Sequence, residues 1–311
     1  MDVLSVGRIS VDLYAVEANA GFDQQQSFVK SIGGSPSNVA IAAARLGHDV
    51  ALATKVGDDA FGDYVRSKLE QFNVSRQFVL SQPNSQTPLA LAALTPPESP
   101  TVAFYRGEAA PDTTLRPGDV PEAVVRGARI LWISHGNLAK GSTADSSLEW
   151  MQMRQREQLT ILDLDYREAM WSSAEKSREK ADQAIGLASV VVGNRAECLM
   201  ALGTDEPNDA AEAILAKGVR LAVIKMGAEG ALFATAERSI RVSPFEIQPV
   251  CGLGAGDAFG GALCHGLLQG WELDKIGLAA NAAGALVSMQ LTCSDAMPTL
   301  KQLEEFMERQ S

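Results

Sequence analysis

The sequence has few of the residues that build disulfide frameworks and metal clusters. Only four cysteines occur in 311 residues, and they show neither a Cys-x-x-Cys pair nor any other spacing typical of metal ligands. Cysteines scattered in this way are usually reduced and lie in or near the core of a cytoplasmic protein. We expect this of all four, namely Cys198, Cys251, Cys264 and Cys293.

Positive charge is also scarce. Lys and Arg number 27 against 38 Asp and Glu, which gives a net charge of −11 at neutral pH. This balance argues against nucleic acid and against an anionic membrane as partners. A negatively charged protein that handles phosphates must gather its few cations locally, so single Arg and Lys residues become informative.

Long hydrophobic runs are missing as well. The longest weakly polar stretch, residues 277–289, is too short to span a bilayer and contains Asn281. The opening Met-Asp-Val lacks the basic region with which a secretory signal begins. With 46% hydrophobic and 21% charged residues, the composition is that of a soluble globular protein with a substantial core. We therefore expect a cytoplasmic location.

Strand and helix patterns alternate along most of the chain. Such alternation is the signature of a parallel sheet with crossover helices, and it predicts one α/β domain over residues 1–311. Strands are predicted at 3–6, 49–56, 130–134, 160–165, 189–192 and 221–225. Helices are predicted at 39–47, 57–72, 142–157, 174–188, 208–217, 255–269, 273–290 and 298–309.

Two segments interrupt this alternation. Residues 89–94 and 101–105 read as a β-hairpin joined by a proline-rich loop, and residues 13–32 are irregular and polar. Together they are expected to form a small β-sheet beside the main domain. We predict that this sheet acts as a lid, made of segments at about 13–32 and 88–106.

The turn Gly254-Ala255-Gly256-Asp257 carries the strongest chemical signal. A strand-like approach precedes it, and a helical pattern follows it. Small residues at a helix N-terminus let backbone N–H groups hold an anion, yet Asp257 places a carboxylate beside that site. The conflict is resolved if the amides hold a transferring phosphoryl group while Asp257 is the base for the attacking hydroxyl. The alternative is a simple turn in which Asp257 caps the helix.

This turn and an upstream block together resemble the signatures of the PfkB (ribokinase-like) family of carbohydrate kinases. The upstream block, residues 33–62, includes Gly-Gly-Ser-Pro-Ser-Asn and Val-Gly-Asp-Asp-Ala-Phe-Gly. The downstream block is residues 250–259, where Cys-Gly-Leu replaces the Asp-Thr-Thr of many members. The resemblance covers essentially the whole chain. It implies a ribokinase-like three-layer α/β sandwich with a mostly parallel central sheet and a small β-sheet lid.

Within this family the chain is similar to the 5-dehydro-2-deoxygluconokinases of inositol breakdown. The similarity lies in residues 7–14, 104–106, 163–171 and 252–257. The 2-keto-3-deoxygluconate kinases are similar at Tyr105-Arg106 but have Asn in place of Asp165. The resemblance implies ATP-dependent phosphorylation of a primary hydroxyl of a keto-deoxy sugar acid, and favours 5-dehydro-2-deoxy-D-gluconate. A 2-keto-3-deoxygluconate kinase, a neutral-sugar (ribose or fructose) kinase and a non-catalytic sugar sensor remain as alternatives.

The resemblance also assigns residues to the phosphoryl transfer. Asp257 is expected to be the general base, beside a backbone cradle made by Gly254, Ala255 and Gly256. Further ATP contacts are expected at Asn194, Lys225, Gly227, Gly230 and Asn281. A solvated surface lysine and an internally bonded helix asparagine are the alternative interpretations of Lys225 and Asn281.

Asn194 and Glu197 resemble the Asn-x-x-Glu motif of the family. They are one helical turn apart, so both can face one point, and their oxygens suit Mg²⁺ held through water beside the ATP phosphates. The alternative is a plain capping pair at the start of a helix. K⁺ is a second candidate ion, and a homodimer is a candidate assembly.

On the sugar side, polar residues match family positions that contact the acceptor. Arg106 and Arg167 are expected to receive a carboxylate, because a guanidinium can donate two hydrogen bonds to it. His135 follows a predicted strand and is a candidate for lining the pocket. The full set of expected acceptor residues is Asp12, Gly33, Gly34, Asn38, Tyr105, Arg106, His135 and Arg167.

Overall fold

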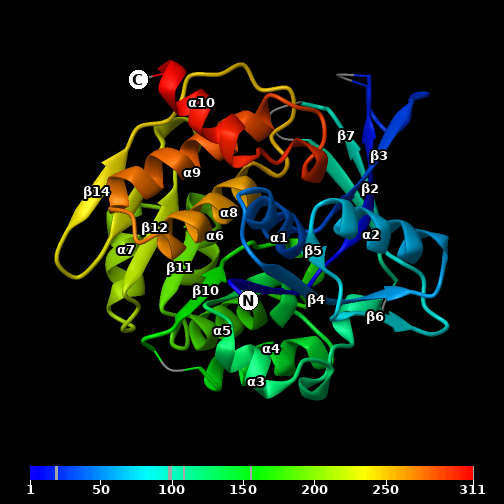
Figure 1. Cartoon of the computed structure of the whole chain (residues 1–311), viewed down its shortest axis with the longest axis horizontal. Helices are drawn as coiled ribbons and strands as arrows, with labels where there is room; N and C mark the ends of the chain where they lie inside the picture. Colours follow the sequence, from blue (N-terminus) through cyan, green and yellow to red (C-terminus); the bar gives the residue numbers. More distant parts are fainter. Residues whose placement is uncertain (18–19, 97–99, 108, 155, 311) are drawn as a thin grey trace.

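A ten-stranded sheet with parallel central strands forms the middle of the computed structural model, which describes residues 1–17, 20–96, 100–107, 109–154 and 156–310 (Figure 1). Its strands are β1 (Val3–Val6), β4 (Val50–Gly57), β5 (Val74–Ser75), β6 (Val79–Gln82), β9 (Ile130–Ser134), β10 (Leu159–Asp163), β11 (Val190–Asn194), β12 (Leu221–Lys225), β13 (Ala231–Ala234) and β14 (Ser239–Val242). The strand order is β14-β13-β12-β11-β10-β9-β1-β4-β5, and β6 pairs with β4. Strands β13 and β14 are antiparallel additions to an otherwise parallel sheet, so the expectation of a mostly parallel sheet is confirmed.

Helices cover both faces of this sheet. One face carries α1 (Ser35–Arg45), α2 (Ala60–Gln71), α8 (Ala255–Leu268), α9 (Leu273–Ser288) and α10 (Leu300–Gln310). The other face carries α3 (Glu122–Gly127), α4 (Ser142–Gln152), α5 (Ala174–Ile185), α6 (Arg195–Leu202) and α7 (Pro207–Leu215). The result is the predicted three-layer sandwich.

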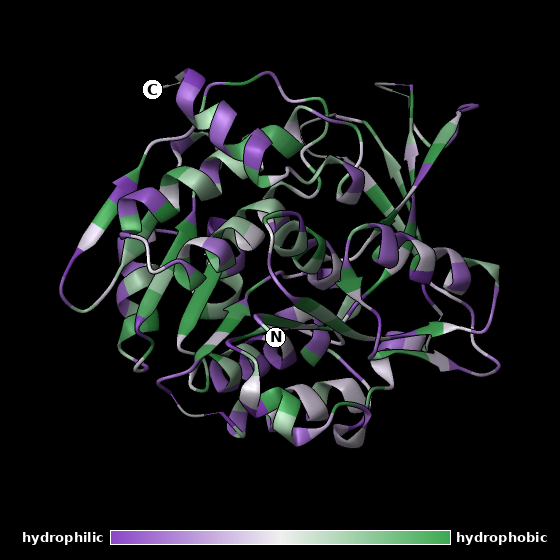
Figure 2. Cartoon of the chain, viewed as in Figure 1, coloured by the Kyte–Doolittle hydropathy of each residue, from purple (hydrophilic) through white to green (hydrophobic). Residues whose placement is uncertain are grey.

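Alternation of side chains along the strands builds two separate cores. In β9, Ile130 and Trp132 enter the core beneath α1 and α8, whereas Leu131 and Ile133 enter the core beneath α4 and α5. Figure 2 shows the central strands as apolar and the polar residues on the outer faces of the helices. Strands buried on both faces must be apolar throughout, which is why their sequences read as short continuous hydrophobic runs.

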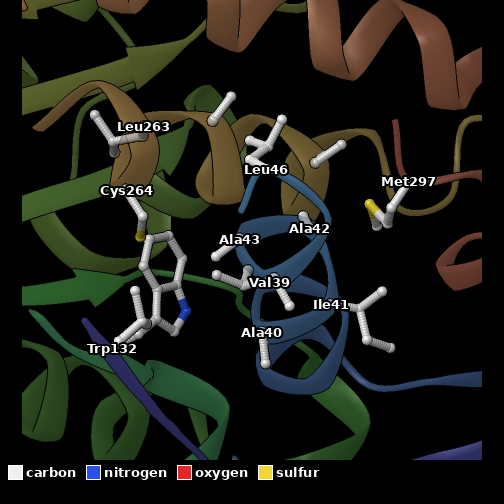
Figure 3. Packing of buried hydrophobic residues seen from close by; sticks show 14 of the residues in the cluster. Val39, Ala40, Ile41, Ala42, Ala43, Leu46, Trp132, Leu263, Cys264 and Met297 are labelled. Carbon is white, nitrogen blue, oxygen red and sulfur yellow. The ribbon is translucent and has the colours of Figure 1, made fainter. Parts of the chain in front are cut away.

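The crossing of α1 and α8 places the ends of these helices at the site. A Cβ on Gly260 would lie 2.6 Å from Cη2 of Trp132, and a Cβ on Gly261 would collide with Ala42. The small residues therefore let the two helices pack closely, as Figure 3 shows around Ala42 and Ala43. Because of this packing, the first turns of both helices open toward the same space.

A second sheet of four strands lies beside the main domain (Figure 1). Its order is β3 (Phe28–Gly33), β2 (Ser10–Ala15), β7 (Leu89–Ala93) and β8 (Thr101–Tyr105), and β7 and β8 pair as the predicted antiparallel hairpin. The first expected segment, 13–32, was too short, since the paired strands run from Ser10 to Gly33. Residues 18–19 and 97–99 of the expected segments lie outside the described residues.

Several predicted boundaries were wrong. The helix expected over 142–157 ends at Gln152, and the buried guanidinium of Arg154 then bonds carbonyl oxygens of Val125 and Ala128. The hairpin β13–β14 was not expected, because its strands are short, whereas the start of α6 was anticipated only through the Asn194–Glu197 pair. None of the helices within the described ranges combines the length and apolar character needed to cross a membrane.

Candidate active site

The start of α8 supplies the backbone cradle expected at the Gly254 turn. Gly254 is the N-cap residue, and its φ of 81° lies in the left-handed region that favours glycine. A Cβ there would lie 2.7 Å from Sγ of Cys293, so only glycine lets the turn pass this side chain. The helix then begins at Ala255, with backbone N–H groups and a partial positive charge that suit an anion.

Asp257 lies in the first turn of α8 but does not cap it. Its Oδ2 accepts a 2.8 Å hydrogen bond from Nδ2 of Asn38 in α1. The N-cap residue of α8 is Gly254, and Asp257 makes no capping hydrogen bond, so the helix-cap alternative is wrong. Burial, and then the charge of Asp165, raise the pKa of Asp257 to about 6, while the hydrogen bond from Asn38 opposes this rise. Such a carboxylate is mostly ionised at neutral pH and still basic enough to accept a proton.

A cavity of about 70 Å³ lies beside this carboxylate, between α1 and the second sheet. Five of the expected acceptor residues line it together with Asp257: Asp12, Gly34, Asn38, Arg106 and Arg167. They come from β2, from the first turn of α1, and from segments that follow β8 and β10. Residues far apart in the sequence therefore converge on one small polar cavity, which we call the acceptor cavity.

Asp12 is the second acid in the acceptor cavity. Its Oδ1 accepts a 2.6 Å hydrogen bond from Ser10, and its Oδ2 accepts one of 3.1 Å from Tyr14. Burial raises the pKa of Asp12 to about 6, and these two hydrogen bonds oppose the rise. A Cβ on Gly33 would overlap the Asp12 carboxylate, so Gly33 contributes space rather than a contact.

The two expected carboxylate receptors already hold carboxylates of the protein. Nη2 of Arg106 donates a 2.6 Å hydrogen bond to Asp112, and Nε of Arg167 donates one of 3.1 Å to Asp165. The side chain of Arg106 is largely buried, whereas that of Arg167 is about half exposed. A guanidinium has five N–H donors, so each arginine keeps donors for a further anion.

Arg8 is a residue of the acceptor cavity that the sequence reasoning missed. It follows β1 and forms a buried ion pair with Asp165, which follows β10. Burial acts to raise the pKa of Asp165, but the charges of Arg8 and Arg167 outweigh it and hold this pKa below its usual value. A charged residue directly after a buried parallel strand was the available signal, because ligands bind at that edge of such sheets.

A second, larger cavity of about 560 Å³ lies on the other side of the Gly254 turn. Ala255 and Gly256 line it, whereas Gly254 and Asp257 line the acceptor cavity, so the turn separates the two spaces. Four residues expected to contact ATP also line this larger cavity: Lys225, Gly227, Gly230 and Asn281. We call it the nucleotide-side cavity.

Asn281 and Gly230 both shape the rim of the nucleotide-side cavity. Nδ2 of Asn281 donates to the carbonyl oxygens of Val242 and Ser243, at 3.2 and 2.8 Å. Asn281 is therefore internally bonded, as its alternative interpretation held, and still lines the cavity. At Gly230, φ is 86° and a Cβ would collide with the carbonyl oxygen of Val242.

Asn194 and Glu197 form a reciprocal capping box at the start of α6. Oδ1 of Asn194 accepts from the N–H of Glu197 at 2.9 Å, and Oε2 of Glu197 accepts from the N–H of Asn194 at 2.7 Å. The capping alternative is thus present in the structure. It does not exclude an ion, because carboxylate oxygens retain further lone pairs.

Two acids at this place, Asp163 and Glu197 of the capping box, both lie near Lys225. Lys225 Nζ lies 3.6 Å from Asp163 and 3.9 Å from Glu197. Burial raises the pKa of Asp163 to about 7; Lys225 opposes this rise, and the charges of Glu197 and Asp165 add to it. In the described part of the chain, no three His, Cys, Asp or Glu side chains converge to hold a metal by themselves. Mg²⁺ here would therefore depend on water and phosphate oxygens for most of its ligands.

Besides Gly33, two of the expected acceptor residues do not line the acceptor cavity. His135 is fully buried, its Nε2 lies 2.9 Å from the Ser177 carbonyl oxygen, and its ring stacks on Trp171. Tyr105 is 63% exposed, because alternation along β8 turns its neighbours Phe104 and Arg106 toward the cavity instead. His135 is thus a packing residue, and Phe104 takes the position that was expected for Tyr105.

Comparison with known proteins agrees with this geometry. Residues 1–300 match the pfkB family carbohydrate kinases. The 5-dehydro-2-deoxygluconokinase of Shouchella clausii is 30% identical over 99% of this chain and 96% of its own length. The 5-dehydro-2-deoxygluconokinase of Bacillus subtilis is 29% identical over 100% of this chain and 97% of its own length.

Solved structures share the fold over nearly the whole chain. A putative ribokinase II from E. coli, in complex with ATP and Mg²⁺, has a TM-score of 0.90 at 22% identity and covers 99% of both chains. The fructokinase of Vibrio cholerae, bound to fructose, ADP and calcium, has a TM-score of 0.87 at 28% identity and covers 98% of both chains. The family match over residues 1–300, together with the 30% identical relative, shows that the chain belongs to the PfkB family of carbohydrate kinases, as its two signatures predicted.

Proposed function

We propose that the protein transfers the γ-phosphoryl group of ATP to a primary hydroxyl of 5-dehydro-2-deoxy-D-gluconate. The observation that carries this proposal is the turn at residues 254–257, which faces the nucleotide-side cavity on one side and an arginine-lined acceptor cavity on the other. Arg8, Arg106 and Arg167 give the acceptor cavity cationic groups in a chain whose net charge is −11. This favours an anionic acceptor, and relatives of similar length carry the name of a kinase for this acid.

In the proposed mechanism, Asp257 accepts the proton of the attacking hydroxyl. Asn38 holds its carboxylate in place, and Asp12, which lines the same cavity, is proposed to bind other hydroxyls of the sugar. The amides of Ala255 and Gly256 hold negative charge on the phosphoryl group as it transfers. Asp163 and Glu197 would hold Mg²⁺ through water, and the ion would neutralise phosphate charge there. Lys225 supplies a positive charge of the chain itself beside both acids.

Arg106 is proposed to distinguish an acid from a neutral sugar, and Arg167 to contact the acceptor in the same cavity. A charge-assisted hydrogen bond contributes roughly 1.5–3 kcal/mol, so Arg106→Ala should lower kcat/KM for the acid by about 10- to 150-fold. Turnover of a neutral analogue, which makes no such bond, should barely change. Steady-state kinetics with both substrates checks this, and an equal loss for acid and neutral sugar would show that Arg106 serves the fold or ATP.

The second sheet is proposed to act as a lid. Ala90, Val102 and Phe104 reach the acceptor cavity from β7 and β8, while Phe28 and Val29 are exposed on the outer strand. A sheet that covers the sugar can exclude water during transfer. Hydrogen exchange of β2, β3, β7 and β8 should therefore slow when the sugar acid is added, whereas exchange in β9 to β12 serves as the unaffected control. Identical lid exchange with and without the acid would rule out closure.

A panel of acceptors tests the proposed function directly. ADP release would be recorded with ATP, Mg²⁺ and K⁺ for 5-dehydro-2-deoxygluconate, 2-keto-3-deoxygluconate, ribose and fructose. We expect the highest kcat/KM with the first of these acids. A preference for fructose would identify a neutral-sugar kinase, the alternative raised by the Vibrio cholerae fructokinase structure. Binding of a sugar without any ADP release would identify a sensor.

A further inference from the structure

A further cavity of about 220 Å³ adjoins the acceptor cavity. The two share Arg8, Phe104 and Arg106. The remaining wall comes from Gly107, Asp112 and Thr113, from the segment 136–140, and from Ala169 and Met170 after β10. The acceptor cavity, of about 70 Å³, has room for about five to seven water molecules at 10–15 Å³ each, which is fewer positions than the non-hydrogen atoms of a six-carbon acid. A substrate whose primary hydroxyl lies at Asp257 must therefore extend past the shared residues. We call the adjoining space the outer cavity.

The charges around the outer cavity do not cancel. Arg8 is paired with Asp165 and Arg106 with Asp112, whereas Lys140 makes no ion pair or hydrogen bond within the described part of the chain. Among the described lining residues, Lys140 is therefore a positive charge without a paired acid. In a chain with a net charge of −11, such a local excess must come from a specific arrangement of side chains.

A buried donor beside the outer cavity also lacks a partner. Arg8 is 7% exposed, and its Nε has no hydrogen-bond acceptor among the described residues. A Cβ on Gly136 would lie 3.1 Å from this nitrogen, so glycine keeps the space beside it open. A buried N–H without an acceptor is costly, and an anion that enters the cavity would remove that cost.

We propose that the outer cavity receives the carboxylate of the sugar acid, and that Lys140 and Nε of Arg8 are specificity-determining groups for it. This inference rests on the proposed function, since it concerns the far end of the same acceptor. Arg106 lines both cavities and lies between the hydroxyl end and the carboxylate end of the substrate. The sugar acid then spans both cavities, with its reacting hydroxyl at Asp257 and its charge at Lys140.

Lys140→Met tests this assignment, with Lys301→Met as a matched control. Lys301 is an exposed lysine on α10, outside the outer cavity, so its loss changes the net charge equally. We expect Lys140→Met to raise KM for the acid about tenfold, with little change in kcat and no change for a neutral sugar. Lys140→Arg should retain most of the affinity. An equal effect of both methionine variants, or an equal rise for acid and neutral sugar, would overturn the inference.

Binding without turnover separates this inference from the proposed function. Titration calorimetry with gluconate, in the absence of ATP, should show weaker binding to Lys140→Met than to the wild-type protein and Lys301→Met. Gly136→Ala should also weaken gluconate binding, because its methyl group occupies the space beside Nε of Arg8. Unchanged gluconate binding in both variants refutes the inference. A wild-type protein that binds gluconate but phosphorylates no sugar acid refutes the proposed function instead.

Discussion

Asp257→Asn is expected to lower kcat on the order of 10²- to 10⁴-fold, because the attacking hydroxyl loses its base. The amide side chain can still accept the 2.8 Å hydrogen bond from Asn38, so the geometry of the two helices is kept. Binding of ATP should survive, since the cradle at Ala255 and Gly256 is made of backbone. Steady-state kinetics and calorimetric titration with ATP measure these two quantities, and a near-normal kcat would remove Asp257 from the role of base.

The same substitution should stabilise the protein at alkaline pH. The pKa of Asp257 is about 6 in the folded state and 3.8 for an unperturbed aspartate, so its ionised form is disfavoured by folding. This penalty is fully present above about pH 6 and disappears as the pH falls below about 4. Asp257→Asn should therefore raise Tm by a few degrees at pH 8, and the gain should shrink toward zero near pH 4.

Thermal unfolding at pH 8, 6 and 4 measures this dependence, with Asp205→Asn as an exposed control that lies away from the site. A pH-independent change in Tm, or the same change in the control, would show that folding does not disfavour the ionised form of Asp257. Loss of activity together with a gain in stability is difficult to obtain from a misfolded variant. The two results therefore support each other.

Asp165→Asn is expected to reduce the free energy of unfolding by about 3–5 kcal/mol, since it leaves the buried guanidinium of Arg8 without its partner. The side chains of both residues are less than 10% exposed, so water cannot replace the lost carboxylate. Arg167, which also pairs with Asp165, loses a partner but is about half exposed and can be hydrated. Urea denaturation at pH 7 measures the difference.

An exposed ion pair provides the control for this prediction. Glu122 and Arg126 pair on α3 with both side chains about half exposed, so Glu122→Gln should cost no more than about 0.5 kcal/mol. The double variant Arg8→Leu/Asp165→Leu should recover much of the stability lost in Asp165→Asn, because a well-packed apolar pair avoids the unpaired charge. Equal losses in Asp165→Asn and Glu122→Gln would contradict the assignment of a buried charge pair.

The three layers of the fold could be predicted from the sequence, whereas strands at the edge of the main sheet and the start of the second sheet could not. A continuous apolar run such as Ile130–Ser134 indicates a strand that is buried on both faces, and this can be read from the local sequence alone. The hairpin β13–β14 was missed because strands of four residues offer too little periodicity, and the second sheet begins earlier than expected because β2 follows β1 almost without a loop.

In the site as well, residues within one short motif could be predicted, whereas contacts between distant parts of the sequence could not. Asp257 was predictable because the turn that holds it is one short motif. Arg8 was missed because its partner, Asp165, is 157 positions away, and only the fold brings the two together. His135 was misplaced because a position after a strand indicates where the backbone goes, not which way the side chain points.

The two cavities on either side of the Gly254 turn are lined by different parts of the sequence. The nucleotide-side cavity draws its lining entirely from residues 225–288, whereas the acceptor cavity takes most of its lining from residues 8–106. Changes in the first third of the sequence can therefore alter the acceptor cavity without touching the lining of the nucleotide-side cavity. A single scaffold with this layout can diversify its acceptors while its phosphate chemistry stays the same, which suits a family of kinases for many carbohydrates.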